Sequence, residues 1–244
     1  GESVFFDDGR VAGIIEAVTT DQLRVRITHT RNPVERLGSD KGINFPDTNL
    51  DLPALSSKDL EDLDFAAHHA DMVGLSFTNG PADVRRLREE LCARGGEHVS
   101  VVAKIETKRG FSNLPGILME ALKFPACGVM IARGDLAVET GFERMAEVQE
   151  EILWVCESAH VPVIWATQVL EELTKHGHAT RAEITDAAMG QAAECVMLNK
   201  GPHMSRAVRV LDNILQRMQG HHAKKRSMLR KLELAANRDR SCSL

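Results

Sequence analysis

The chain has no tyrosine among its 244 residues, and aromatic side chains make up only 4% of it. A hydrophobic core must therefore be built mainly from aliphatic side chains. No apolar run in the sequence approaches the ~20 residues that a transmembrane helix needs. The first residues, Gly1 to Ser3, lead directly into a strand pattern and lack the features of a signal peptide. We therefore expect a cytoplasmic protein without a membrane partner.

Cysteine is also scarce and scattered. The five cysteines are Cys92, Cys127, Cys156, Cys195 and Cys242. Because no two of them form a C-x-x-C pair, the sequence indicates neither a zinc site nor a disulfide framework. This usage is typical of a reducing compartment. Positive charge is not in excess either, since the net charge is −5, and nothing favours a nucleic-acid partner.

The first 40 residues have an all-β pattern. Apolar runs over Ser3–Phe6 and 11–15 flank Asp7-Asp8-Gly9, and an Asp-Gly pair favours a hairpin turn. Residues 23–28 alternate between apolar and polar side chains, as a half-buried strand does. Three short strands make a poor free-standing domain. We therefore expect residues 1–40 to be part of a larger β domain.

From residue 41 to about 220, candidate strands alternate with candidate helices. Strands are predicted over 72–77, 99–106, 128–132, 161–166 and 195–198, and helices over about 57–69, 81–94, 111–122, 142–159, 181–193 and 204–219. The strands are rich in Val, Ile, Met and Ala and show no polar alternation, as in a parallel sheet buried on both faces. This alternation is typical of the α/β class. A parallel (β/α) barrel of the TIM type has eight such units, and we count five here.

The last segment, residues 221–244, is locally basic. We interpret it as a solvated helix or a frayed tail in preference to a specific site for an anion or a partner. The histidines show no metal-ligand spacing on a shared face, so we expect them on the surface. Thr180 and Glu183 have the spacing of a capping box at a helix start. Arg181, between them, could also stabilise a subunit contact.

Charged side chains end the predicted strand over 99–106. Lys104 and Glu106 are two residues apart, so their side chains share one face of that strand. An exposed ion pair of this kind would contribute little. A buried strand that ends in two charges instead favours a functional role. In a barrel of parallel strands the carboxyl ends form the rim where active sites lie.

Two further strand ends carry polar residues. Asp135 follows the strand over 128–132, and Gly134 beside it allows close backbone approach to an anion. Thr167 ends the strand over 161–166. Taken alone, Asp135 reads better as a turn aspartate and Thr167 as an ordinary strand residue. Together with Glu106, however, Asp135 suits Mg²⁺ or Mn²⁺. A lysine beside such a metal suits a transferring phosphoryl group or an enolate.

Longer motifs around these residues occur in a fixed order. They are Phe6-Asp7-Asp8-Gly9, Lys41-Gly-Ile-Asn44-Phe-Pro46, Leu50-Asp51-Leu52-Pro53-Ala54-Leu55-Ser56, Met72-Val73, Ser76-Phe77, Lys104-Ile-Glu106, Ala132-Arg-Gly-Asp135-Leu-Ala-Val-Glu139, Ala166-Thr167-Gln168-Val-Leu-Glu171, Thr180-Arg-Ala-Glu183 and Met197-Leu198. In this order and spacing, from about residue 3 to 220, the chain resembles the pyruvate kinase family. The resemblance implies a catalytic barrel over 41–220 and, over 1–40, the end of the β lid that the family inserts into it.

The resemblance also implies roles for single residues. Lys104 would stabilise phosphoryl transfer between phosphoenolpyruvate and ADP. Glu106 and Asp135 would hold Mg²⁺ or Mn²⁺, and the backbone N–H groups of Gly134 and Asp135 would bind the substrate carboxylate. Thr167 would lie beside the enolate carbon, near the point of proton delivery.

Two weaker assignments follow from the same resemblance. Ser76 would contribute to substrate binding, and Asp8, on the lid, would approach the nucleotide. The family also uses K⁺, but its K⁺ ligands are not in this chain. The parts that supply the first three barrel strands and a phosphate-binding arginine are absent from it too. We therefore expect either a homo-oligomer or a missing N-terminal segment.

Two loops depart from the family pattern. Asn199-Lys200-Gly201-Pro202 stands where the family usually has Ser-Gly-Glu-Thr, and Thr78-Asn79-Gly80 replaces its usual basic residues. These departures leave two alternatives open. One is a metal-dependent lyase or aldolase that acts on pyruvate enolate. The other is a non-catalytic half-barrel that serves in assembly.

Overall fold

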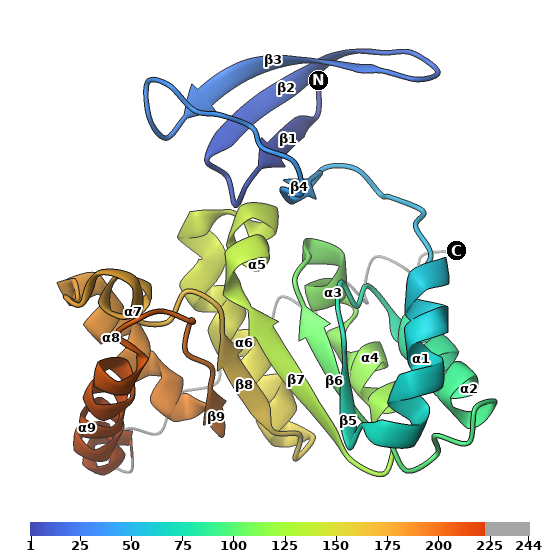
Figure 1. Ribbon diagram of the computed structural model, residues 1–244, viewed down its shortest axis with the longest axis vertical. Helices are drawn as coiled ribbons and strands as arrows, with labels where there is room; N and C mark the ends of the chain where they lie inside the picture. The colour runs from blue at the N-terminus through green and yellow to red at the C-terminus, as the bar shows by residue number, and fades with distance from the viewer. Residues whose placement is uncertain (223–244) are drawn as a thin grey trace, which may run out of the picture.

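The computed structural model describes residues 1–222, with side chains up to residue 219, in two layers (Figure 1). An antiparallel sheet is formed by the N-terminal residues, and a larger α/β layer follows it. The basic segment predicted over 221–244 lies outside the described residues, apart from the backbone of its first two. Within residues 1–222, no helix has both the length and the apolar character needed to cross a membrane.

The N-terminal sheet has four strands in the order β3-β2-β1-β4. They are β1 (Ser3–Phe6), β2 (Val11–Val18), β3 (Leu23–Thr30) and β4 (Ile43–Asn44). The predicted hairpin between β1 and β2 is confirmed, and Asp7, Asp8 and Gly9 take positive φ angles of 52°, 56° and 77° there. Strand β4 was not predicted, because two residues carry no periodicity.

The larger sheet has five parallel strands in the order β5-β6-β7-β8-β9. They are β5 (Met72–Leu75), β6 (Ser100–Ile105), β7 (Cys127–Ala132), β8 (Val163–Ala166) and β9 (Cys195–Val196). The prediction of five βα units with parallel strands is confirmed. Each strand adds next to its predecessor, so the carboxyl ends of β6, β7 and β8 lie side by side.

Helices follow the parallel strands. They are α1 (Ser57–His69), α2 (Pro81–Cys92), α3 (Lys108–Ser112), α4 (Leu114–Ala121), α5 (Arg133–Thr140), α6 (Met145–Ser158), α7 (Glu171–His176), α8 (Arg181–Met189) and α9 (Met204–His222). The predicted capping box at Thr180 and Glu183 is present at the start of α8. Helices α5 and α7 were not predicted, because each is only eight or six residues long.

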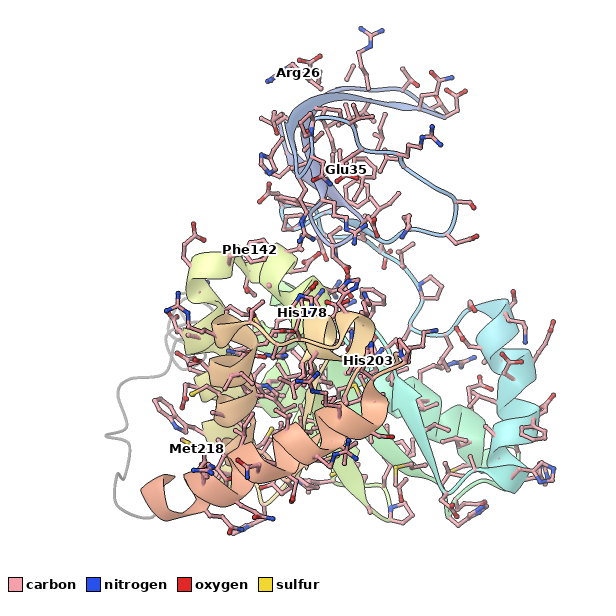
Figure 2. The ribbon with its side chains drawn as sticks, turned by 60° about the vertical axis from the view of Figure 1, so that its left-hand side comes forward. Arg26, Glu35, Phe142, His178, His203 and Met218 are labelled. Atoms are coloured by element: carbon pink, nitrogen blue, oxygen red, sulfur yellow. The ribbon has the colours of Figure 1, made fainter. Side chains whose placement is uncertain are left out.

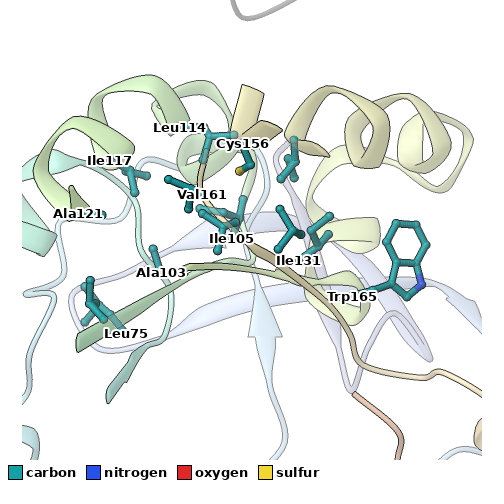
Figure 3. Packing of buried hydrophobic residues seen from close by; sticks show 14 of the residues in the cluster. Leu75, Ala103, Ile105, Leu114, Ile117, Ala121, Ile131, Cys156, Val161 and Trp165 are labelled. Atoms are coloured by element: carbon teal, nitrogen blue, oxygen red, sulfur yellow. The ribbon is translucent and has the colours of Figure 1, made fainter. Parts of the chain in front are cut away.

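One face of the parallel sheet forms the core. The register aligns Leu75, Ala103, Val129 and Val163 in one row, and all four are at most 4% exposed. Figure 3 shows labelled members of this cluster packing beneath the helices. Aliphatic side chains dominate it, as the scarcity of aromatic residues requires.

The opposite face is less buried than predicted. On the edge strand β5, Met72 is 60% exposed and Gly74 is open to solvent, whereas Val102, Met130 and Ile164 on the inner strands are half-buried. Within residues 1–222 the helices that cover the sheet pack on the core face, so the continuous apolar pattern of the strands misled the prediction. The five strands form an open sheet with β5 and β9 at its edges.

The N-terminal sheet lies over the carboxyl ends of the parallel strands, close to α5 (Figure 1). Its β1–β2 turn packs on α5, since a Cβ atom on Gly9 would lie 3.5 Å from Val138 Cγ2. Figure 2 shows Phe142 beneath this sheet and Met218 at the opposite end of the molecule. The sheet therefore covers the rim where the candidate site residues were predicted.

Candidate active site

Lys104 and Glu106 form an ion pair at the end of β6. Lys104 Nζ lies 2.9 Å from Glu106 Oε1 and donates a hydrogen bond of 2.8 Å to Ser76 Oγ. The side chain of Glu106 is only 5% exposed, whereas that of Lys104 is 25% exposed. The predicted shared face is confirmed, and Ser76 joins the pair from the end of β5. An ammonium group thus stands at the opening of the site above a buried carboxylate.

The loop after β5 supplies a second hydrogen-bond partner to the Glu106 carboxylate. The backbone N–H of Phe77 donates to Glu106 Oε2, and Phe77 takes a φ of 47°. A bulky residue in the left-handed region is a conformational outlier, and such outliers gather at functional sites. A carboxylate has about four lone-pair positions. Glu106 therefore keeps acceptor capacity for a cation beyond its two present partners.

Asp135 lies in the first turn of α5, which begins directly after β7. The helix start has no capping side chain of its own. Thr167 supplies one from the end of β8, because its Oγ1 accepts a hydrogen bond of 2.9 Å from the N–H of Gly134. Taken alone, Asp135 was interpreted as a turn aspartate, and the structure places it in the first turn of a helix instead. Gly134 and Thr167 are brought into direct contact.

The electrostatics of Asp135 favour a cation. Burial raises the pKa of Asp135, the amide of Asn44 lowers it, and the nearby Glu106 raises it again. Asp8, on the β1–β2 turn, has a raised pKa from burial and then from Asp135. Neighbouring carboxylates repel when ionised, and a bound cation relieves that repulsion.

The donor set was tested against the predicted divalent metal. Among residues 1–219, no group of three or more His, Cys, Asp or Glu side chains has the arrangement of a metal site. Mg²⁺ is commonly held by one or two carboxylates, with waters and substrate phosphate oxygens completing its shell. Glu106 and Asp135 supply such a pair of oxygen donors. The residues therefore fit Mg²⁺ or Mn²⁺ bound together with a substrate.

Arg133 holds the end of β8 in place. Its Nε donates to the carbonyl of Ala166 at 3.0 Å and its Nη2 to the carbonyl of Thr167 at 2.7 Å. The same guanidinium pairs with Asp186 on α8 and lies 4.8 Å from the ring centre of Trp165. Thr167 takes a φ of 61°, which is unusual for a β-branched residue. The Arg133 contacts hold that backbone in place.

Asp8 reaches the same rim from the N-terminal sheet. Gln168 Nε2 donates to Asp8 Oδ2 at 3.5 Å, and the N–H of Gln168 donates to Asn199 Oδ1 at 3.0 Å. The Asn199 loop, one of the two departures from the family pattern, therefore contacts the residue next to Thr167.

The histidines among residues 1–219 are exposed, as predicted. Figure 2 labels two of them, His178 and His203.

Three residues of the site had no predicted role: Asn44, Glu139 and Arg133. Asn44 donates to Asp135 and Glu139, and Arg133 supports Thr167. Their only signal in the sequence was their place inside the motifs that carry the family resemblance. Asn44 bonds to residues at least 91 positions away in the sequence, and Arg133 bonds to Thr167, 34 positions away. Local spacing and periodicity cannot reveal such contacts.

Comparison of the sequence with known proteins identifies its family. A sequence model described as the barrel domain of pyruvate kinase matches residues 1–203. The chain belongs to the pyruvate kinase family. It is 38% identical over 202 residues to a pyruvate kinase of Hypocrea jecorina, covering 82% of this chain and 36% of that protein. It is 39% identical over 222 residues to a pyruvate kinase of Mycobacterium tuberculosis, covering 88% of this chain and 45% of that protein.

The chain thus spans about two fifths of the length of the curated pyruvate kinases that it matches. A relative from Debaryomyces hansenii gives the same picture, with 36% identity over 221 residues and 42% of its length covered. Family membership applies to the segment that carries Lys104, Glu106, Asp135 and Thr167, because all four lie within the matched residues 1–203.

Proposed function

We propose that this chain carries the metal and phosphoryl-transfer part of a pyruvate kinase active site. The reaction is transfer of a phosphoryl group between phosphoenolpyruvate and ADP, in the cytoplasm. The observation that supports this proposal most is the convergence of Lys104, Glu106 and Asp135 at adjacent strand ends. The N-terminal sheet is the part of the lid that covers them, and the parallel sheet is part of a TIM-type barrel.

Each residue has a distinct task in this proposal. Glu106 and Asp135 hold the divalent ion, which when bound supplies positive charge to the substrate oxygens. Lys104 places its ammonium group where negative charge develops on the transferring phosphoryl group. Ser76 orients that ammonium group through its hydrogen bond.

The start of α5 binds the substrate carboxylate. A helix N-terminus offers N–H groups and a favourable dipole to an anion. The N–H of Gly134 donates to Thr167 Oγ1, and an incoming carboxylate would take over this donor. The Thr167 hydroxyl has an O–H of its own, which is not used in that bond and can donate toward the enolate carbon. Asp8 approaches the nucleotide from the lid.

A lyase is the second candidate, favoured by the loop after β5. Thr78, Asn79 and Gly80 bring no positive charge to the rim, and the Thr78 hydroxyl is turned inward to the Leu75 carbonyl at 2.8 Å. A less cationic rim suits a substrate without a second phosphate group. Dependence of turnover on ADP distinguishes the kinase from a metal-dependent pyruvate-enolate lyase, and lack of metal binding would leave the non-catalytic half-barrel.

The metal site is tested by titrating residues 1–244 with Mn²⁺ and measuring the free ion by electron paramagnetic resonance. A Glu106→Gln, Asp135→Asn double variant should weaken Mn²⁺ binding by more than the ~10–100-fold that loss of an outer-shell partner causes. The matched control is Asp62→Asn with Glu89→Gln, which removes the same charge from exposed positions on α1 and α2. Equal Mn²⁺ affinity in the two double variants would refute the assignment of these ligands.

A second expectation concerns residues 1–244 on their own. The parallel sheet has open edges at β5 and β9, and an uncovered face that includes Met72. Open edges and exposed apolar faces promote association. We expect analytical ultracentrifugation to detect species larger than a monomer, and negligible phosphoryl transfer by this chain alone. A stable monomer with high kinase turnover would contradict this expectation.

A further inference from the structure

Asn44 lies at the contact between the two layers. Its side chain is 4% exposed. Its Nδ2 donates to Asp135 Oδ1 at 3.3 Å and to Glu139 Oε1 at 3.2 Å, both on α5. One amide group thus uses its two N–H bonds on two carboxylates that would otherwise repel each other. Asparagine is suited to this role, because aspartate has no donor when ionised.

The orientation of this amide is set by the carboxylates alone. Asn44 Oδ1 is buried and has no hydrogen-bond partner. Buried acceptors are nearly always satisfied, so an exception calls for an explanation. The explanation here is that turning the amide over would leave Asp135 and Glu139 without a donor and bring a third oxygen against them.

Asn44 moves with the N-terminal sheet. It forms half of β4, where it is paired with Phe5 of β1. The N–H of Asp7 donates to the carbonyl of Gly42 at 3.0 Å, which fixes the same segment to the β1–β2 turn. A displacement of the sheet away from α5 therefore withdraws the Asn44 amide from Asp135.

We propose that Asn44 is a positioning residue that couples docking of the N-terminal sheet to the metal affinity of Asp135. This inference rests on the proposed role of Asp135 as a metal ligand. With the sheet docked, the amide fixes the Asp135 carboxylate in one orientation and separates it from Glu139. With the sheet undocked, that orientation is lost. Because binding free energies are reciprocal, a divalent ion at Asp135 stabilises the docked sheet.

Two variants test this coupling. Asn44→Ala removes the amide, and Asn44→Leu removes it while keeping a similar side-chain volume. Both should weaken Mn²⁺ binding about 10–100-fold, the range for loss of an outer-shell partner. The matched control is Asn49→Ala, in the segment that connects β4 to α1. Asn49 Oδ1 accepts a hydrogen bond of 2.7 Å from Arg109 on α3 and is bonded to neither Asp135 nor Glu139. Its Mn²⁺ affinity should stay that of the unaltered chain.

Hydrogen–deuterium exchange gives a readout that a purely structural role would not produce. In the unaltered chain, Mn²⁺ should increase the protection of residues 3–44 from exchange, and in both Asn44 variants this metal-dependent gain should disappear. Unchanged Mn²⁺ affinity in both variants, or an unchanged gain in protection, would overturn the coupling while leaving the metal site intact. Absence of Mn²⁺ binding in the unaltered chain would overturn the proposed function together with the coupling.

Discussion

Replacing Lys104 by methionine is expected to lower phosphoryl transfer by about 10²–10³-fold, the usual effect of losing one group that stabilises transition-state charge. Methionine keeps much of the length of the lysine side chain and removes only the ammonium group. Lys104 contacts Ser76 and Glu106, and a quarter of its side chain faces solvent. Because Glu106 is only 5% exposed and would keep just the Phe77 N–H as a partner, we expect the free energy of unfolding of residues 1–244 to fall by about 1–2 kcal/mol, with the fold retained.

Turnover is best compared in a hybrid, because residues 1–244 are expected to be inactive alone. In this hybrid, residues 3–203 replace the matching segment of the Mycobacterium tuberculosis relative, and Lys104 or methionine occupies position 104. Ser112→Ala serves as a control that should keep the turnover of the hybrid, because the half-buried Ser112 hydroxyl donates to the Lys108 carbonyl within α3. A collapse of stability with full activity per folded molecule would instead identify Lys104 as a structural residue.

Replacing Arg133 by methionine is expected to produce the largest loss of stability among single changes near the site. Arg133 is 8% exposed and binds two backbone carbonyls and Asp186. Breaking a fully buried ion pair costs about 3–5 kcal/mol. Because the Asp186 side chain is 32% exposed and can be rehydrated, we expect a reduction of about 2–3 kcal/mol in the free energy of unfolding.

Denaturant unfolding measures this loss, and Arg86→Met provides the matched control. Arg86, whose side chain is 56% exposed, pairs with Glu90 four residues on in α2, and Glu90 keeps Arg94 as a second partner. Helix pairs of this spacing contribute only ~0.3–0.5 kcal/mol. Should Arg133→Met be as mild as Arg86→Met, the Arg133 contacts would not hold the Thr167 backbone in place.

The strands and their order were predictable because buried parallel strands have continuous apolar sequences. Lys104 and Glu106 could be placed on one face because alternate side chains of a strand point to the same side. Helix α5 was missed because its eight residues contain Gly134 and Asp135, which are typical of turns. The uncovered sheet face was missed because an apolar strand does not show what packs against it.

The site was predictable in its charged residues and not in the residues that position them. Lys104, Glu106 and Asp135 follow strand ends, and a polar residue in that place is a local signal. Asn44 and Arg133 act through contacts that are distant in sequence. The capping of α5 by Thr167 also requires that β7 and β8 be neighbours in parallel register, which only the folded chain provides.

Phosphorus relaxation of phosphoenolpyruvate in the presence of Mn²⁺ is the most direct test of a shared site for metal and substrate. A paramagnetic ion shortens the ³¹P relaxation time only when the phosphate is bound close to it. Our account predicts that the relaxation rate rises with the concentration of residues 1–244, and that the rise is lost in the Glu106→Gln, Asp135→Asn double variant. Equal relaxation rates with the unaltered chain and with the double variant would show that these carboxylates do not bring metal and substrate together.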